Sequence, residues 1–98
     1  MSLEVRQTTT FARWLAALRD RQAKARILVT IERMASGHFG DAKALGAGVV
    51  ETRLHVGPGY RLYYTRRGEH LVVLLAGGSK STQVRDIAKA RTLAAGLE

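Results

Sequence analysis

The side chains most able to do chemistry lie on and beside a predicted hairpin of strands 49–56 and 60–66. Both strands alternate, and Gly57-Pro58-Gly59 between them is a turn signal, because glycine reaches positive φ and proline presets its own φ. If the turn centres on Pro58, residues whose numbers sum to about 116 lie opposite each other, roughly 5 Å apart. Arg53 then faces Tyr63, and His55 faces Arg61. The sequence therefore predicts one polar patch, joined by Lys80 from beyond the third strand: Glu51, Arg53, His55, Arg61 and Tyr63.

These residue types suit the cleavage of RNA without a metal ion. When a 2′-hydroxyl attacks the neighbouring phosphate, a base must accept its proton and cations must stabilise the charge on the phosphorane. Arg53, Arg61 and Lys80 suit the cationic role. The carboxylate, imidazole and phenol of the patch could transfer protons, provided that nearby cations lower the pKa of Tyr63. The same pattern also describes an ordinary solvated sheet face, and both interpretations stay open.

Other catalytic or metal-binding patterns are missing from the sequence. The chain has no cysteine, and His38, His55 and His70 are far apart, so we expect neither a zinc site nor any other metal. The stretch Gly78-Ser79-Lys80-Ser81 lacks the earlier glycine of a Walker loop. We expect no cofactor.

The charge balance indicates a polyanionic partner. Sixteen Lys and Arg residues oppose eight Asp and Glu, which gives a net charge of +8. Arginine, whose planar fork binds phosphate in two places and stacks on bases, outnumbers lysine. A role in solubility alone is the alternative. For nucleic acid, we expect RNA contacts from five side chains: Lys43, Arg53, Arg61, Lys80 and Arg85.

The length and hydropathy predict a single domain over residues 1–98. The N-terminal residues are too polar for a signal peptide, and the longest apolar stretch, 71–76, is far short of the roughly 20 residues that span a bilayer. We therefore expect a cytoplasmic protein without a membrane segment.

Hydrophobic periodicity predicts an α+β fold of order β-α-α-β-β-β-α. Thr10 is the expected cap of the first helix, and Gly37 ends the second. Glycine-rich residues 37–48 are expected to lack regular structure. The third strand is apolar on both faces, so it should be central, with Gly77-Gly78 ending it. The two helices should cover one face of the small twisted sheet, with Tyr64 beneath them. The expected elements are a strand at 3–6, helices at 11–19 and from Asp20 or Arg21, strands at 49–56, 60–66 and 70–76, and a helix from Ser81 or Thr82 to about 95.

Four blocks of sequence resemble one known family. FARWLAALRD-x-x-AKARI, GDAKALGAGVVETRL, GPGYRLYYTRRGE and LLAGGSKSTQ-x-x-DI-x-x-A are similar, in this order, to the HigB-type addiction module killer proteins of the RelE/ParE superfamily. The resemblance covers about 11–90. It implies a RelE-like fold and a toxin encoded beside a helix-turn-helix antitoxin. It also implies a ribosome-dependent mRNA endonuclease that stops translation.

The resemblance also assigns roles to single residues. It implies that Arg61 and Lys80 stabilise the phosphate and that Glu51 and Arg53 keep the charges of a Glu-Leu-Arg block. Thr52 replaces the leucine of that block. Ser79 stands where the family often has aspartate, and Gln83 and Arg85 occupy the place of a C-terminal tyrosine or histidine. Apolar side chains of the first helix are expected to bind the antitoxin: Phe11, Trp14 and Leu15.

Two other functions fit the same residues. Relatives on this fold inhibit DNA gyrase without catalysis, and a non-catalytic nucleic-acid-binding module or decayed toxin would share the charge. For the nuclease, we expect that Arg61→Ala spares the fold and abolishes cleavage.

Overall fold

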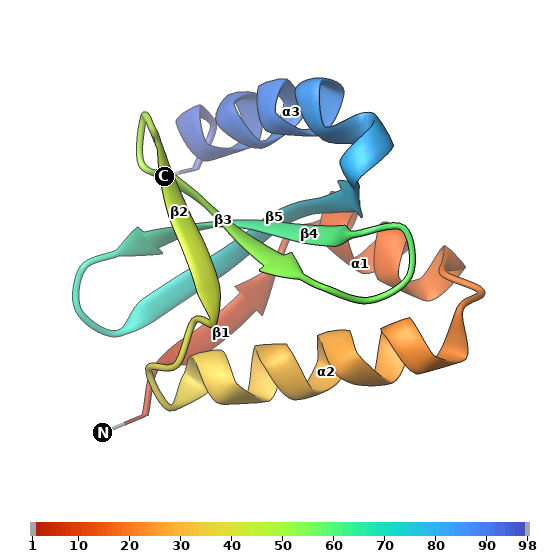
Figure 1. Ribbon diagram of the computed structural model, residues 1–98. Helices are drawn as coiled ribbons and strands as arrows, with labels where there is room; N and C mark the ends of the chain where they lie inside the picture. The colour runs from red at the N-terminus through yellow and green to blue at the C-terminus, as the bar shows by residue number, and fades with distance from the viewer. Residues whose placement is uncertain (1, 98) are drawn as a thin grey trace.

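The computed structural model describes residues 2–97 and has an α+β fold (Figure 1). Its elements are β1 (Glu4–Gln7), α1 (Thr9–Ala17), α2 (Arg21–Ala35), β2 (Asp41–Gly46), β3 (Val49–Leu54), β4 (Tyr60–Arg67), β5 (Leu71–Ser79), a 3-10 turn (Lys80–Thr82) and α3 (Gln83–Ala95). The predicted fold class is confirmed, with one strand more than expected.

The sheet has the strand order β1-β5-β4-β3-β2. β1 runs parallel to β5, and the other pairs are antiparallel. β5 lies between β1 and β4 with residues 72–78 buried, which confirms the prediction of a central strand covered on both faces. The prediction that Gly77-Gly78 ends this strand was wrong, because β5 continues through both glycines to Ser79.

Helices cover both faces of the sheet, with α1 and α2 on one face and α3 on the other (Figure 1). The apolar side chains of α1 and α2 pack in one core with Leu62, Tyr64 and Leu74. On the opposite face, Ala90 and Ala94 of α3 pack against Val49 and Tyr63, among others. Alternate residues of β3 and β4 therefore enter separate cores, as the period of two requires, and Tyr64 lies under the helices as predicted.

Side-chain caps fix where the first two helices begin. Thr8 accepts a hydrogen bond from the backbone N–H of Phe11 at 3.0 Å, so Thr8, and not Thr10, caps α1. The hydroxyl of Thr8 also donates to the carbonyl of Leu75 at 2.6 Å. Asp20 accepts from the N–H of Ala23 and caps α2, which begins at Arg21, one of the two predicted starts. The cap of α1 is thus set by its contact with β5, which the sequence pattern does not show.

The expectation that residues 37–48 lack regular structure was wrong, because they include β2. Five of the six residues of β2 are exposed, on both sides of this edge strand, so no alternation of apolar and polar residues marks it. Gly40 and Gly46 bound the strand with positive φ of 66° and 85°. The glycines that seemed to exclude a strand instead form its turns.

The hairpin register also differs from the prediction. Arg53 pairs with Arg61 and Glu51 pairs with Tyr63, so paired numbers sum to 114 and not to 116. The loop between the strands is longer than expected, since β3 ends at Leu54, and His55 therefore lies beyond the strand. A shift of two residues changes the partners but keeps each side chain on its face.

Candidate functional site

Three of the predicted cations converge at one end of the β3–β4 hairpin. Arg53, Arg61 and Lys80 line a hollow of about 260 Å³. The other residues around it are Leu54, His55, Gly59 and Tyr60. We call this hollow the cation pocket. Its floor is the hairpin, and Lys80 reaches it from the 3-10 turn that follows β5.

A single buried carboxylate holds the two arginines of the cation pocket. Glu51 is fully buried, and its Oε1 accepts from Arg53 Nε at 3.0 Å and from Arg61 Nη1 at 3.3 Å. Its Oε2 accepts from Gln83 Nε2 at 2.8 Å. Gln83 is the first residue of α3, so this helix covers the patch that the sequence left open as a solvated face.

The environment of Glu51 keeps its carboxylate ionised. Burial alone would raise the pKa of Glu51, but the hydrogen bonds from Gln83 and Arg53 and the positive charge of Arg61 outweigh it. The pKa of Glu51 therefore lies below its usual value. A carboxylate that is fully buried and saturated with donors orients the arginines and is poorly placed to accept a proton from a substrate.

Tyr63 is also unsuited to transfer a proton. It is fully buried, and its hydroxyl has no hydrogen-bond partner among the described residues. Burial and the negative charge of Glu51 raise the pKa of Tyr63, although the charge of Arg61 opposes them. The expected lowering of this pKa by cations is wrong, because the charge of Glu51 acts on the pKa of Tyr63 more strongly than the charge of Arg61 does, so Tyr63 stays protonated.

His55 remains as the exposed titratable group of the cation pocket. Its Nε2 lies 2.8 Å from Oδ2 of Asp41 on β2, and both side chains are more than half exposed. When His55 is neutral, its Nε2–H donates to this carboxylate and its Nδ1 is the free acceptor. Asp41 therefore orients His55 much as carboxylates orient catalytic histidines.

Arg61 and Lys80 differ in how much the stability of the fold depends on them. The side chain of Arg61 is only 10% exposed, and its Nε has no partner among the described residues. Replacing it by alanine would leave Glu51 with one cation fewer in a buried site, which destabilises the protein. That Arg61→Ala spares the fold stays a prediction, and the structure adds that this variant loses stability. Lys80 is exposed and makes no ion pair within residues 2–97, so its removal tests the site without that cost.

Two other predicted RNA contacts lie outside the cation pocket. Lys43 is exposed on β2, opposite Glu51. Arg85 lies in the first turn of α3, with its Nε 3.7 Å from Asp86 Oδ1. Neither lines the pocket, so the structure brings together only part of the predicted set.

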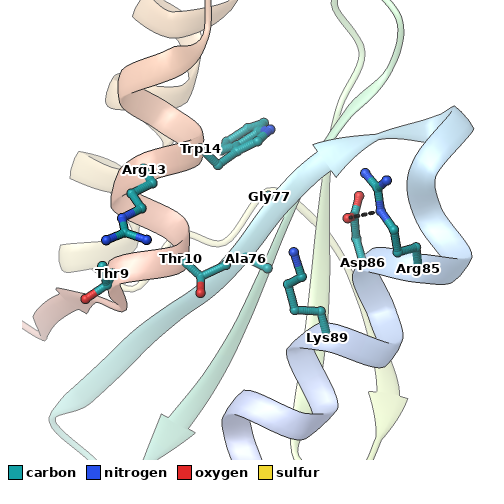
Figure 2. A pocket seen from close by; sticks show the side chains of 9 residues that line it. All are labelled: Thr9, Thr10, Arg13, Trp14, Ala76, Gly77, Arg85, Asp86 and Lys89. Carbon is teal, nitrogen blue, oxygen red and sulfur yellow. Dashed lines mark ion pairs between the residues drawn. The ribbon is translucent and has the colours of Figure 1, made fainter.

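The predicted partner-binding residues of α1 are mostly core. Phe11 is fully buried and Leu15 is 8% exposed, so neither offers a surface to an antitoxin, and that expectation is corrected for both. Trp14 is half-buried and lies beside Gly77 at the surface of a second hollow (Figure 2).

Gly77 and Gly78 make room for two side chains. A Cβ on Gly77 would lie 2.3 Å from the ring of Trp14, and one on Gly78 would lie 1.8 Å from Oδ2 of Asp86. Asp86 is buried and accepts a hydrogen bond from Thr82 at 2.5 Å. These glycines therefore fix α1 and α3 against β5, and with α3 the position of Gln83.

The sequence analysis gave no role to Asp41 or Asp86, and Gln83 entered it only as a departure from the family. Asp41 lies in the segment 37–48, which was expected to be irregular. No strand pairing was therefore predicted that would place Asp41 next to His55. The Asp-Ile pair at 86–87 belongs to a quoted block, but only the contact with Gly78 shows why an acid stands there. Among residues 2–97, no cluster of three His, Cys, Asp or Glu side chains could hold a metal ion. No helix in that range is long and apolar enough to cross a membrane.

Comparison with known proteins finds a sequence relative and a structural relative. No family model matches the chain. An uncharacterized protein of Haemophilus influenzae is 44% identical over 94 residues, which are 96% of this chain and 95% of that protein. A chain of the RelBE2 toxin–antitoxin complex from Mycobacterium tuberculosis superposes with a TM-score of 0.66 and 29% identity, covering 82% of this chain and 100% of that one. The chain therefore belongs to the same family as the Haemophilus protein, within the RelE-like toxin superfamily.

Proposed function

We propose that this protein is the toxin of a toxin–antitoxin pair and that it cleaves messenger RNA on the ribosome. The observation that supports this most is the cation pocket, in which Arg53, Arg61 and Lys80 converge beside His55. The likeness to a chain of a toxin–antitoxin complex supports the toxin role and an antitoxin partner. The HigB-type resemblance suggests that this partner carries a helix-turn-helix domain.

The pocket suits an attack by the 2′-hydroxyl of RNA. His55 Nδ1, oriented by Asp41, accepts the hydroxyl proton. The 2′-oxygen then bonds to phosphorus and the bond to the 5′-oxygen breaks, which leaves a 2′,3′-cyclic phosphate and a 5′-hydroxyl. The departing oxygen takes up one proton, for which the Lys80 ammonium is the exposed acid in the pocket.

The cations stabilise the charge that develops in this step. Arg53 and Arg61 are held by Glu51 before substrate binds, so they need not reorganise during the reaction. Preorganised charges of this kind often give the largest share of catalysis. In this proposal Glu51 and Gln83 are positioning residues, and Arg53, Arg61, Lys80 and His55 touch the substrate.

Lys80→Ala and His55→Asn test the proposal without disturbing the core, because both side chains are exposed. Each should lower the cleavage rate by about 100-fold or more, as expected for the loss of a charge stabiliser or a general base. The measurement is primer extension on a translated message after induction. Wild-type protein should give discrete cuts within the reading frame.

Arg26→Ala is the matched control, since Arg26 is an exposed cation on α2 outside the cation pocket, and it should cut like the wild type. Undiminished cutting by both pocket variants would refute the assigned roles. Growth arrest with an uncut message and altered DNA supercoiling would instead indicate a gyrase inhibitor.

A further inference from the structure

A second basic hollow lies at the edge of β5, between α1 and α3 (Figure 2). It has a volume of about 490 Å³. Arg13 reaches it from α1, and Arg85 and Lys89 reach it from α3, one turn apart. The hydroxyls of Thr9 and Thr10 and the ring of Trp14 complete the lining used here. We call this the flanking hollow.

The cations of the flanking hollow outnumber its acids. Asp86 is the one carboxylate in the lining, and it is already bound by Thr82 and lies near Arg85. Arg13 and Lys89 make no ion pair or side-chain hydrogen bond within residues 2–97. Two cations without partners, which line one hollow from different helices, form a site for an anion with more than one charge.

Trp14 is a fixed aromatic surface in this hollow. Its ring lies against Gly77, where even a Cβ would not fit, with Phe11 at 5.7 Å and Tyr60 at 6.2 Å between ring centroids. The ring is nevertheless half-buried and not enclosed, so part of it faces the hollow. A held aromatic ring between cations is the arrangement by which proteins bind single-stranded nucleic acid, through stacking and phosphate contacts.

The flanking hollow continues to the cation pocket. A third hollow of about 280 Å³ shares Trp14, Gly77 and Arg85 with the flanking hollow. The same hollow shares Tyr60 with the cation pocket. The three hollows are therefore neighbours at the end of the sheet, with most of the cations in the two outer ones.

We infer that the flanking hollow binds the single-stranded RNA next to the linkage held in the cation pocket, with a base stacked on Trp14 and phosphates bound by Arg13 and Lys89. This inference rests on the proposed function, because it extends the same substrate along the surface. RNA fits better than a protein segment, since protein interfaces are anchored by apolar pockets. Apart from Trp14 and Ala76, the lining is charged, hydroxylated or glycine.

Trp14 is the single tryptophan of the chain, so its fluorescence reports directly on the flanking hollow. The probe is a 2′-O-methyl RNA of about ten nucleotides, which lacks the attacking hydroxyl and is long enough to extend beyond one pocket. We expect the oligonucleotide to quench the fluorescence of Trp14. A dinucleotide that fills the cation pocket alone should leave it unchanged.

The double variant Arg13→Ala/Lys89→Ala tests the phosphate contacts. It should weaken binding of the oligonucleotide by about tenfold and make its salt dependence less steep. The control Arg21→Ala/Arg26→Ala removes the same charge from exposed positions of α2 and should change the affinity by about twofold at most. Cleavage by the two double variants is measured on a translated message as above.

The following outcomes would overturn the inference. If the oligonucleotide leaves Trp14 unquenched and the two double variants bind alike, the inference fails, and intact cutting of the message would show that the proposed function survives. If the wild type neither binds nor cuts RNA, both fail. If Arg13→Ala/Lys89→Ala weakens only the binding of the antitoxin, the hollow is a protein site and the inference is overturned.

Discussion

At the scale of single residues, the site depends on one buried carboxylate. Glu51 joins Arg53 of its own strand, Arg61 of β4 and Gln83 of α3, so three elements meet at two oxygen atoms. A buried charge is stable only when it is paired and hydrogen-bonded, and here every partner is in place. The carboxylate of Glu51 thus positions the two arginines of the cation pocket.

Glu51 should make the stability of the protein depend on pH in the acid range. Its pKa is lowered in the folded state from the usual 4.5, so the unfolded chain takes up the proton first as the pH falls. As far as Glu51 is concerned, the free energy of unfolding should stay constant above pH 4.5 and should fall as the pH drops below 4.5. Urea unfolding at a series of pH values measures the effect.

Glu51→Gln should flatten that pH dependence and lower the stability at neutral pH by about 3 kcal/mol, because Arg61 loses its buried partner. Glu69→Gln, at an exposed turn, is the control and should keep the wild-type profile. A wild-type profile in Glu51→Gln would show that Glu51 does not hold the arginines as a charged group.

At the scale of elements, the sequence predicted what depends on local pattern. The faces of β3 and β4, the central position of β5 and the start of α2 at Arg21 all follow from periodicity and turns. The convergence of Arg53, Arg61 and Lys80 was also predicted, because a register shift of two residues leaves each side chain on the same face of the sheet. β2 was not predicted, because this exposed edge strand carries no alternation of apolar and polar residues. The cap at Thr8 was not predicted either, because it depends on a contact with β5, which is distant in the sequence.

The burial of Glu51 and Tyr63 could not be predicted from the sequence, because it too depends on a contact between distant segments of the chain. The polar letters of 49–56 indicate an exposed face, and only the docking of α3 shows that this face is covered. That docking depends on Gly78, whose missing side chain admits Asp86. In the sequence, two adjacent glycines indicate the end of a strand more readily than a contact surface.

Gly78→Ala should destabilise the protein by about 3 kcal/mol, at the upper end of what overpacking costs, since its Cβ would overlap Asp86. Thermal or urea unfolding measures the loss. Gly96→Ala is the control, because Gly96 has a φ of −85° and a Cβ there would make an ordinary contact of 3.6 Å. In a Gly78→Ala/Asp86→Ala double variant the losses should not add, because Asp86 causes the overlap. Equal stability of Gly78→Ala and Gly96→Ala would contradict this account.

At the scale of the whole molecule, the charge is spread widely while the proposed path for RNA is narrow. The chain carries +8 in total, and exposed arginines also lie on α2, outside the three hollows. A uniform positive field would attract RNA to any face. The number of phosphates contacted in the complex therefore separates a defined path from general attraction.

The salt dependence of RNA binding measures how many phosphates the protein contacts. Six cations line the cation pocket and the flanking hollow: Arg13, Arg53, Arg61, Lys80, Arg85 and Lys89. For single strands, the log of the affinity should fall against the log of the salt concentration with a slope no steeper than about −4. Fluorescence anisotropy of a labelled oligonucleotide measures it. A slope approaching about −11 would mean that all sixteen cations take part and that the path is not selective.

The parallel pairing of β1 with β5 constrains when the protein can become active. Glu4 lies beside Leu71, so the first strand to be synthesised can pair only after the last strand has been made. Lys80 and Gln83 follow later still, and without them the arginines of the hairpin have neither their third cation nor the cover over Glu51. A nascent chain whose residues 80–83 have not yet left the ribosome lacks a finished pocket. An early stop codon anywhere before α3 should therefore yield a harmless product.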